Sequence, residues 1–311
     1  MYNNEYIRRI IFLLVNYIIK ENQMKKNDKI TGVLYIILSA ISFGIMPILA
    51  KLAYNGGANA ITTLFLRFLF ATLMLLYYLK SKKISMKINK KQGLLIVLLA
   101  IVGYSLTSAT LFMAYNYISV GMATMLLYTY PAIVTFLSTL IFKEKVHAKK
   151  LICLVLSISG IFIMIEGKSA YNPLGIVLGL LSAICYSLYV LGACHKEIKK
   201  INSYVMTFYV SLLAAFAQLI FGLSTNNLNF HIEFYSFIAI LLLAFISTVV
   251  ALMAFLQGVR VIGSSNAAIF STLEPIVSLV LGVLILKEQL TFRIVLGSLL
   301  IISSMIILAR E

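Results

Sequence analysis

Long apolar blocks constrain the fold of this chain more than any other feature. Blocks of 18 or more residues carry almost no charge. With a rise of about 1.5 Å per helical residue, each block can cross a hydrocarbon core about 30 Å thick. Only 12% of the residues are charged and 61% are apolar, which excludes a soluble globular domain. The sequence therefore predicts an all-α polytopic membrane protein.

We interpret the blocks as ten transmembrane helices joined by short connections. They cover residues 30–51, 58–79, 92–117, 120–142, 147–166, 173–194, 203–223, 234–257, 264–286 and 291–309. The N-terminal extension, residues 1–23, contains an apolar run that is too short to span a membrane. Because Met24 is followed directly by two lysines and the first block, this extension is either an over-extended start or an interfacial helix.

Basic residues alternate between the connections. If the start lies inside, 18 of them fall on the inner side, and the outer side holds four: Lys51, Lys168, Lys287 and Arg293. Lysine and arginine in short loops set orientation, which predicts a multi-pass protein of the cell membrane with both termini in the cytoplasm. The net charge of +16 lies in these connections and not in one patch with aromatic residues, so we expect no nucleic-acid partner.

The two halves of the chain are related by an internal repeat. Residues 128–146 align without gaps on 272–290 and share Pro131 with Pro275, together with a Lys-Glu pair at 143–144 and 287–288. The motif LSAI at 38–41 recurs at 181–184. We therefore predict two five-helix repeats, 30–166 and 173–309. An odd number of spans per repeat inverts one repeat relative to the other, a common plan for secondary transporters.

Taken together, these features resemble the EamA family of the drug/metabolite transporter superfamily. The resemblance rests on the ten-span pattern, on Arg67 in the second span, on the intramembrane prolines of spans four and nine, and on the Lys-Glu pair after each of those spans. It implies a bacterial-type inner-membrane carrier, often an exporter of amino acids or other small metabolites, with a central cavity between the repeats.

Glu274 is the one acidic residue that falls deep inside a predicted span. A charged carboxylate at that depth costs about 3 kcal/mol on insertion scales, so such a group usually faces a cavity or a partner. Pro275 follows it and lacks an amide hydrogen, which predicts a kink beside the acid. The functional interpretation is substrate binding or proton coupling; the alternative is a neutral or paired residue that holds helices together.

Other polar residues lie at similar depth. Arg67 can extend its guanidinium outward, bond carbonyls or Glu274, or contact a substrate carboxylate. Tyr130 is the repeat-mate of Glu274, and Pro131, like Pro275, predicts a helix kink. The further candidates for substrate binding or coupling are Tyr104, which shares a face with Thr107 and Ser108, and Tyr186, Tyr189 and Ser42. Each is alternatively a hydrogen bonder between packed helices.

These patterns favour a secondary transporter that exports a small metabolite such as an amino acid by alternating access. The alternative is a non-transporting membrane sensor or assembly partner on the same scaffold. The sequence contains no HExxH, GxSxG or phosphate-loop motif, and its three His and three Cys do not cluster, so we expect no enzyme, cofactor or metal site. The expected partners are a small-molecule substrate and the lipid bilayer. A homodimer is possible.

Overall fold

The computed structural model describes residues 28–114, 116–118, 120–142, 147–163, 172–286 and 292–309. The N-terminal extension and both Lys-Glu pairs, 143–144 and 287–288, lie outside the described residues. Helices occur in all ten predicted segments, and the described ranges contain no strand.

The helices of the first half are α2 (Asp28–Gly44), α3 (Met46–Asn55), α4 (Ala60–Ser81), α5 (Lys90–Leu98), the π-helix η1 (Leu99–Ser105), α6 (Leu106–Ala114), α7 (Val120–Leu127), α8 (Tyr130–Phe142) and α9 (Ala148–Ile163). The second half contains α10 (Pro173–Ala193), α11 (Lys196–Lys199), α12 (Ser203–Ser224), α13 (Phe234–Ala244), the π-helix η2 (Phe245–Val250), α14 (Ala251–Ile262), α15 (Ser264–Phe270), α16 (Leu273–Leu286) and α17 (Phe292–Ala309).

Six helical segments of the described chain are long and apolar enough to cross a membrane. They are 29–55, 60–81, 90–114, 173–193, 203–224 and 234–262. Shorter apolar helices occur at 130–141 and 295–304. The protein is therefore a multi-pass membrane protein, and the full number of ten spans stays a prediction.

Asparagine caps position the starts of four helices. The Asn59 side chain accepts a hydrogen bond from the Thr62 amide at the start of α4. Asn89 caps α5, Asn172 caps α10 beside a proline, and Asn202 caps α12. A side-chain oxygen at this position satisfies amide groups that the first helical turn leaves without an intrahelical partner. These caps define the residue at which each of the four helices begins.

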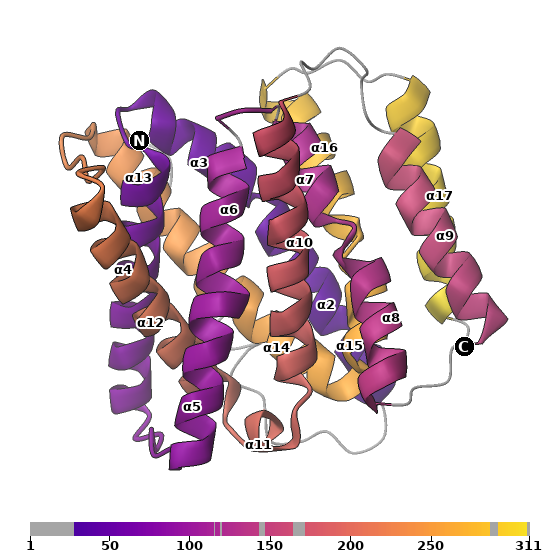
Figure 1. Cartoon of the computed structure of the whole chain (residues 1–311), viewed down its shortest axis with the longest axis horizontal. Coiled ribbons are helices and arrows are strands. Elements are labelled where there is room, and N and C mark those ends of the chain that lie inside the picture. Colours follow the sequence, from indigo (N-terminus) through magenta and orange to yellow (C-terminus); the bar gives the residue numbers. More distant parts are fainter. Residues whose placement is uncertain are drawn as a thin grey trace, which may run out of the picture.

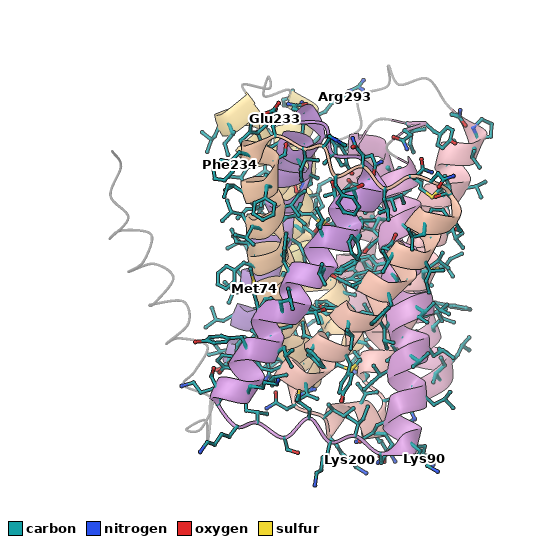
Figure 2. The ribbon with its side chains drawn as sticks, turned by 90° about the vertical axis from the view of Figure 1, so that its left-hand side faces the viewer. Met74, Lys90, Lys200, Glu233, Phe234 and Arg293 are labelled. Carbon is teal, nitrogen blue, oxygen red and sulfur yellow. The ribbon has the colours of Figure 1, made fainter. Side chains whose placement is uncertain are left out.

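The bundle has two chemically different ends (Figure 2). Lys90 and Lys200 lie at one end, and Glu233, Phe234 and Arg293 lie at the other. We call the first end the lysine face; its exposed lysines are Lys80, Lys82, Lys83, Lys87, Lys90, Lys91, Lys196, Lys199 and Lys200. There Lys200 donates a hydrogen bond to the Glu197 carboxylate at 2.6 Å, which lowers the pKa of that half-buried carboxyl.

The two halves interrupt their helices at equivalent places. A turn at 128–129 separates α7 from α8, and a turn at 271–272 separates α15 from α16. The π-helices η1 and η2 likewise fall in the third span of each half. In Figure 1, α7–α8 and α15–α16 run in opposite directions, as an inverted repeat requires. The irregular turns of the two halves thus meet in the middle of the bundle, where α8 packs against α15.

Two glycines permit close helix contacts near this region. A Cβ on Gly103 would lie 2.9 Å from the Tyr189 Cβ, and a Cβ on Gly179 would lie 2.8 Å from a methyl group of Leu126. Both distances are shorter than ordinary van der Waals contacts. Small residues therefore let α10 approach η1 and α7 closely, which brings the tyrosines of span six toward those of span three.

Candidate functional site

The guanidinium of Arg67 lies inside the bundle and does not extend to the surface. The residue is 1% exposed. Its Nε donates to Thr248 Oγ1 at 2.6 Å, and its Nη2 donates to the Ser247 carbonyl at 2.7 Å. A longer contact of 3.4 Å joins Nη2 to the Tyr104 hydroxyl, and Nη1 lies 3.1 Å from the Met46 sulfur. Arg67 therefore ties α4 of the first half to η2 of the second.

The π-helix η2 exposes the carbonyl that Arg67 uses. A π-turn widens the helix and releases backbone groups from the regular hydrogen-bond ladder, which is why such turns often occur at functional positions. The Ser247 hydroxyl donates to the Ser42 carbonyl at 2.9 Å, which attaches η2 to α2 as well. Ser42 thus joins this cluster through its backbone.

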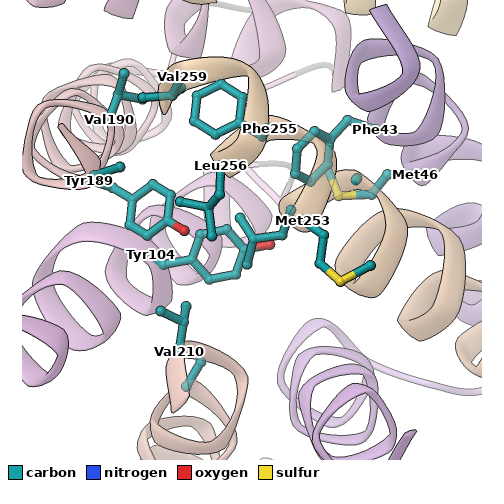
Figure 3. Close-up of a cluster of buried hydrophobic side chains, with 14 of the residues drawn as sticks. Phe43, Met46, Tyr104, Tyr189, Val190, Val210, Met253, Phe255, Leu256 and Val259 are labelled. Atoms are coloured by element: carbon teal, nitrogen blue, oxygen red, sulfur yellow. The ribbon is translucent and has the colours of Figure 1, made fainter. Parts of the chain in front are cut away.

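Five tyrosines form a connected group beside Arg67. Tyr104 contacts Tyr189, with ring centroids 5.3 Å apart, and Tyr189 stacks on Tyr186 at 6.2 Å. Tyr186 packs edge-on against Tyr130 at 4.8 Å, and Tyr130 contacts Tyr128 at 6.1 Å. Figure 3 shows Tyr104 and Tyr189 side by side, with the Tyr189 hydroxyl pointing toward the Tyr104 ring. The group joins η1, α8 and the turn at 128–129 of the first half to α10 of the second.

Apolar side chains enclose one side of the tyrosine group. Phe255 of α14 lies 6.0 Å from Tyr186, and Phe68 lies 5.6 Å from Tyr104. Figure 3 places Met46 and Met253 on the same side as the Tyr104 hydroxyl. Apolar neighbours lower the local dielectric constant, which strengthens the electrostatic interactions among the polar groups.

Glu274 adds the carboxyl of the cluster. It lies in the first turn of α16, and unlike Arg67 it retains partial exposure. Its carboxyl interacts electrostatically with the Arg67 guanidinium and with the hydroxyls of Tyr128 and Tyr130. It also interacts with Tyr186. A carboxyl, a guanidinium and several phenols therefore share one region at the junction of the two halves.

The two proline turns place Tyr130 and Glu274 symmetrically. Pro131 is the second residue of α8 and Pro275 is the third residue of α16, so both lie in a first helical turn, where a missing amide costs little. The Tyr130 hydroxyl donates to the Ala268 carbonyl of α15 at 3.3 Å, so the interrupted helix of one half bonds that of the other. Both sequence-predicted kink positions thus lie directly after an interruption of a helix.

The structure brings together the side chains of Glu274, Arg67, Tyr130, Tyr104 and Tyr186, and it adds Ser42 through its carbonyl. Thr107, which shares a predicted face with Tyr104, bonds back to the Gly103 carbonyl and lies 3.4 Å from the Ser182 carbonyl, so it contacts α10.

Sequence reasoning missed three residues of the cluster. Tyr128 is 1% exposed, and its hydroxyl interacts with the Glu274 carboxyl. Ser247 and Thr248, both fully buried, bind Arg67. In the sequence, Tyr128 stands two residues before Tyr130 in the segment Tyr128-Thr129-Tyr130-Pro131, which could have identified it. The adjacent hydroxyl residues Ser247 and Thr248 in the eighth predicted span could have indicated the partners of Arg67.

The arrangement can hold a small molecule by complementary polar groups. The carboxyl can bind an amine, the guanidinium can bind an anionic group, and phenols can donate or accept hydrogen bonds and stack on apolar parts. The described residues contain no group of His, Cys, Asp and Glu that could hold a metal ion.

Comparison with known proteins agrees with this geometry. The profile of the EamA-like transporter family matches residues 30–166 and 173–310. These two matches cover most of the chain, so the protein belongs to the EamA-like transporter family and is a membrane protein of that class.

Relatives with related sequences carry transporter names. An uncharacterized transporter of Archaeoglobus fulgidus is 27% identical over 278 residues, covering 89% of this chain and 95% of the relative. The uncharacterized transporter YcbK of Bacillus subtilis is 24% identical over 290 residues, covering 89% and 92%. The uncharacterized inner membrane transporter YicL of Salmonella typhimurium is 24% identical over 292 residues, covering 90% and 95%.

A solved crystal structure has the same fold. It superposes with a TM-score of 0.78 and covers 90% of this chain and 96% of its own chain. Sequence identity is 12%, so this likeness shows the architecture alone.

Proposed function

We propose that the protein is a secondary transporter that exports a small polar or amphipathic metabolite, such as an amino acid, by alternating access across the cytoplasmic membrane. Ten spans in two inverted repeats would place the lysine face and both termini in the cytoplasm, by the positive-inside rule. Movement of one repeat against the other would open the central cluster to each side in turn.

One observation carries this proposal. The only acidic residue deep in a predicted span, Glu274, meets Arg67 and a group of tyrosines at the junction of the two halves. A helix-packing role alone needs the polar groups to satisfy one another. Instead, the fully buried hydroxyl of Tyr189 has no hydrogen-bond partner among the described residues. Such a hydroxyl is available to a ligand.

In the proposed cycle, Glu274 binds the amino group of the substrate or carries a proton. Its partial exposure, next to buried phenols, places it at the border of the cluster where a substrate would arrive. Arg67 is already held by Thr248 and Ser247, so it acts mainly as a fixed positive charge that orients the carboxyl and the substrate.

The test begins with an untargeted comparison of metabolites inside and outside cells with and without the protein. The metabolite that depends on the protein is then followed in proteoliposomes with Glu274→Gln, which keeps size and hydrogen bonding but removes titration. We expect a folded variant whose transport is lost or no longer depends on the pH gradient.

Glu233→Gln is the matched control, because Glu233 is exposed at the end of the bundle opposite the lysine face. It should transport like the parent. If Glu274→Gln also transports like the parent from about pH 5.5 to pH 8, the acid does not take part in coupling. The binding site would then be sought among Tyr104, Tyr130 and Tyr186.

A further inference from the structure

A row of buried hydroxyls runs along one side of α12. Ser203, Thr207 and Ser211 recur every fourth residue and therefore share a face of the helix. Their exposed fractions are 1%, 0% and 0%. None of the three hydroxyls has a hydrogen-bond partner among the described residues. We call this set the α12 hydroxyl row.

Hydroxyls elsewhere in the bundle behave differently. Thr72 donates to the Phe68 carbonyl at 2.8 Å, and Ser187 donates to the Ala183 carbonyl at 2.7 Å, each four residues back. This is the usual way in which an apolar helix satisfies a buried hydroxyl. Thr207 and Ser211 have the same option within α12 and do not use it. Buried polar groups without a protein partner are commonly satisfied by ordered water.

A small cavity opens at the lysine-face end of this row. Its volume is about 20 Å³, and its lining includes Ser203 and the polar side chains of Tyr35, Tyr204 and Gln257. A volume of this size holds about one water molecule, and a water molecule needs two to four polar partners. The cavity has this volume, four of its lining residues carry polar side chains, and Ser203 connects it to the rest of the row.

The other end of the row lies close to the Arg67 cluster. α12 packs antiparallel to α4, because Tyr78 stacks on Tyr204 with ring centroids 4.7 Å apart and Gly222 packs against Ile61. These two contacts place Ser211 opposite a position about one helical turn from Arg67. The row therefore covers the distance between the lysine face and the cluster.

The contacts of Gln218 extend the row away from the lysine face. This residue lies on the same side of α12, and its Nε2 donates to the Ser105 hydroxyl of η1 at 3.0 Å. Its Oε1 has no hydrogen-bond partner among the described residues. Ser105 follows Tyr104 directly, so α12 presents polar atoms from the cavity to the π-helix that carries a residue of the cluster.

We propose that the α12 hydroxyl row binds a chain of water molecules and forms the route by which solvent from the lysine face reaches Arg67 and Tyr104. Serine and threonine hydroxyls suit this task because each can donate to one water and accept from another. This inference rests on the transport function proposed above, because the role of the route is to supply water or protons to the cluster from one side.

Cysteine reactivity tests the route without a transport assay. In a chain whose Cys153, Cys185 and Cys194 are replaced, Thr207→Cys and Ser211→Cys are reacted in membranes with N-ethylmaleimide. The reagent crosses the bilayer but reacts with the thiolate, which forms next to water. Val205→Cys is the matched control, since Val205 is 2% exposed, lies two residues from Thr207 and faces the other side of α12. Size-exclusion profiles establish that each variant is folded.

We expect the two row variants to react at least about tenfold faster than Val205→Cys, because thiolate content sets the rate. Pretreatment with a membrane-impermeant methanethiosulfonate from the lysine face should block this reaction, and pretreatment from the opposite face should not. Reaction no faster than the control would overturn the route, and blocking only from the opposite face would overturn its direction. Because labelling needs no substrate, a failed route and a failed transport function give different results.

Discussion

Replacing Thr248 by valine tests whether Arg67 ties the two halves together. The substitution keeps the shape of the side chain and removes the hydroxyl that accepts from Arg67 Nε at 2.6 Å. Both residues are buried, with exposed fractions of 0% and 1%. One charged donor is left without that partner, while the Ser247 carbonyl still accepts from Nη2 at 2.7 Å.

The expected loss of unfolding free energy lies between two general values for the contribution of a hydrogen bond. A hydrogen bond to a charged group contributes about 1.5–3 kcal/mol in proteins generally. Hydrogen bonds between membrane helices average about 0.6 kcal/mol and reach about 1.7. Because Arg67 keeps its remaining contacts, we expect Thr248→Val to cost about 1–2 kcal/mol. At about 2–4 °C per kcal/mol, the melting temperature should fall by about 2–8 °C.

The matched control is Thr72→Val, the same substitution on the helix that carries Arg67. The Thr72 hydroxyl donates only within α4, to the Phe68 carbonyl, and that carbonyl keeps its helical amide partner. We expect a cost below about 0.5 kcal/mol for this variant. Unfolding in detergent, followed by loss of the monodisperse chromatographic peak on heating, measures both.

A double-mutant cycle with Arg67→Met isolates the contact between the two side chains. If Thr248→Val melts like Thr72→Val, and the cycle gives no coupling, the guanidinium does not depend on Thr248. The assignment of Arg67 as the tie between α4 and η2 would then be wrong.

Three further predictions concern packing, topology and the N-terminus. Gly103→Ala should lower the free energy of unfolding by about 1–3 kcal/mol, because the new Cβ would lie 2.9 Å from the Tyr189 Cβ. In the control Gly93→Ala, the new Cβ would lie 3.7 Å from its nearest neighbour, so the same melting assay should show no change or a gain of up to about 1 kcal/mol. Asn227→Cys, in the chain without native cysteines, should react with an impermeant reagent in intact cells, and protection in a well-inserted protein would contradict the orientation. A chain that starts at Met24 should insert and transport normally; failure to accumulate in membranes would favour an interfacial helix instead.

The apolar blocks were sufficient to place helices along the chain. Every predicted segment contains a described helix, because a span must satisfy its backbone hydrogen bonds internally and so needs a continuous apolar run. The repeat was also visible in the sequence, since Pro131 and Pro275 share one register. These patterns carried the resemblance to the EamA family, which is confirmed by the profile that matches 30–166 and 173–310.

The candidate site was only partly predictable. Glu274 and Arg67 stood out because a charge is costly inside a membrane and is therefore rare there. Ser247 and Thr248 gave no comparable signal, because single hydroxyls are common in membrane helices and most bond back to their own helix. Their role depends on the π-helix η2, which turns a carbonyl and a hydroxyl toward Arg67.

The sequence by itself determined where the helices lie, that they form two related halves, and which charged groups occur deep in the spans. These properties are local, since they depend on the polarity and spacing of residues along one helix. Only the tertiary structure decided which groups meet. Contacts between Arg67 and Thr248, or among the five tyrosines, join residues far apart in the chain. Their geometry depends on close glycine contacts and interrupted helices, which helical periodicity does not encode.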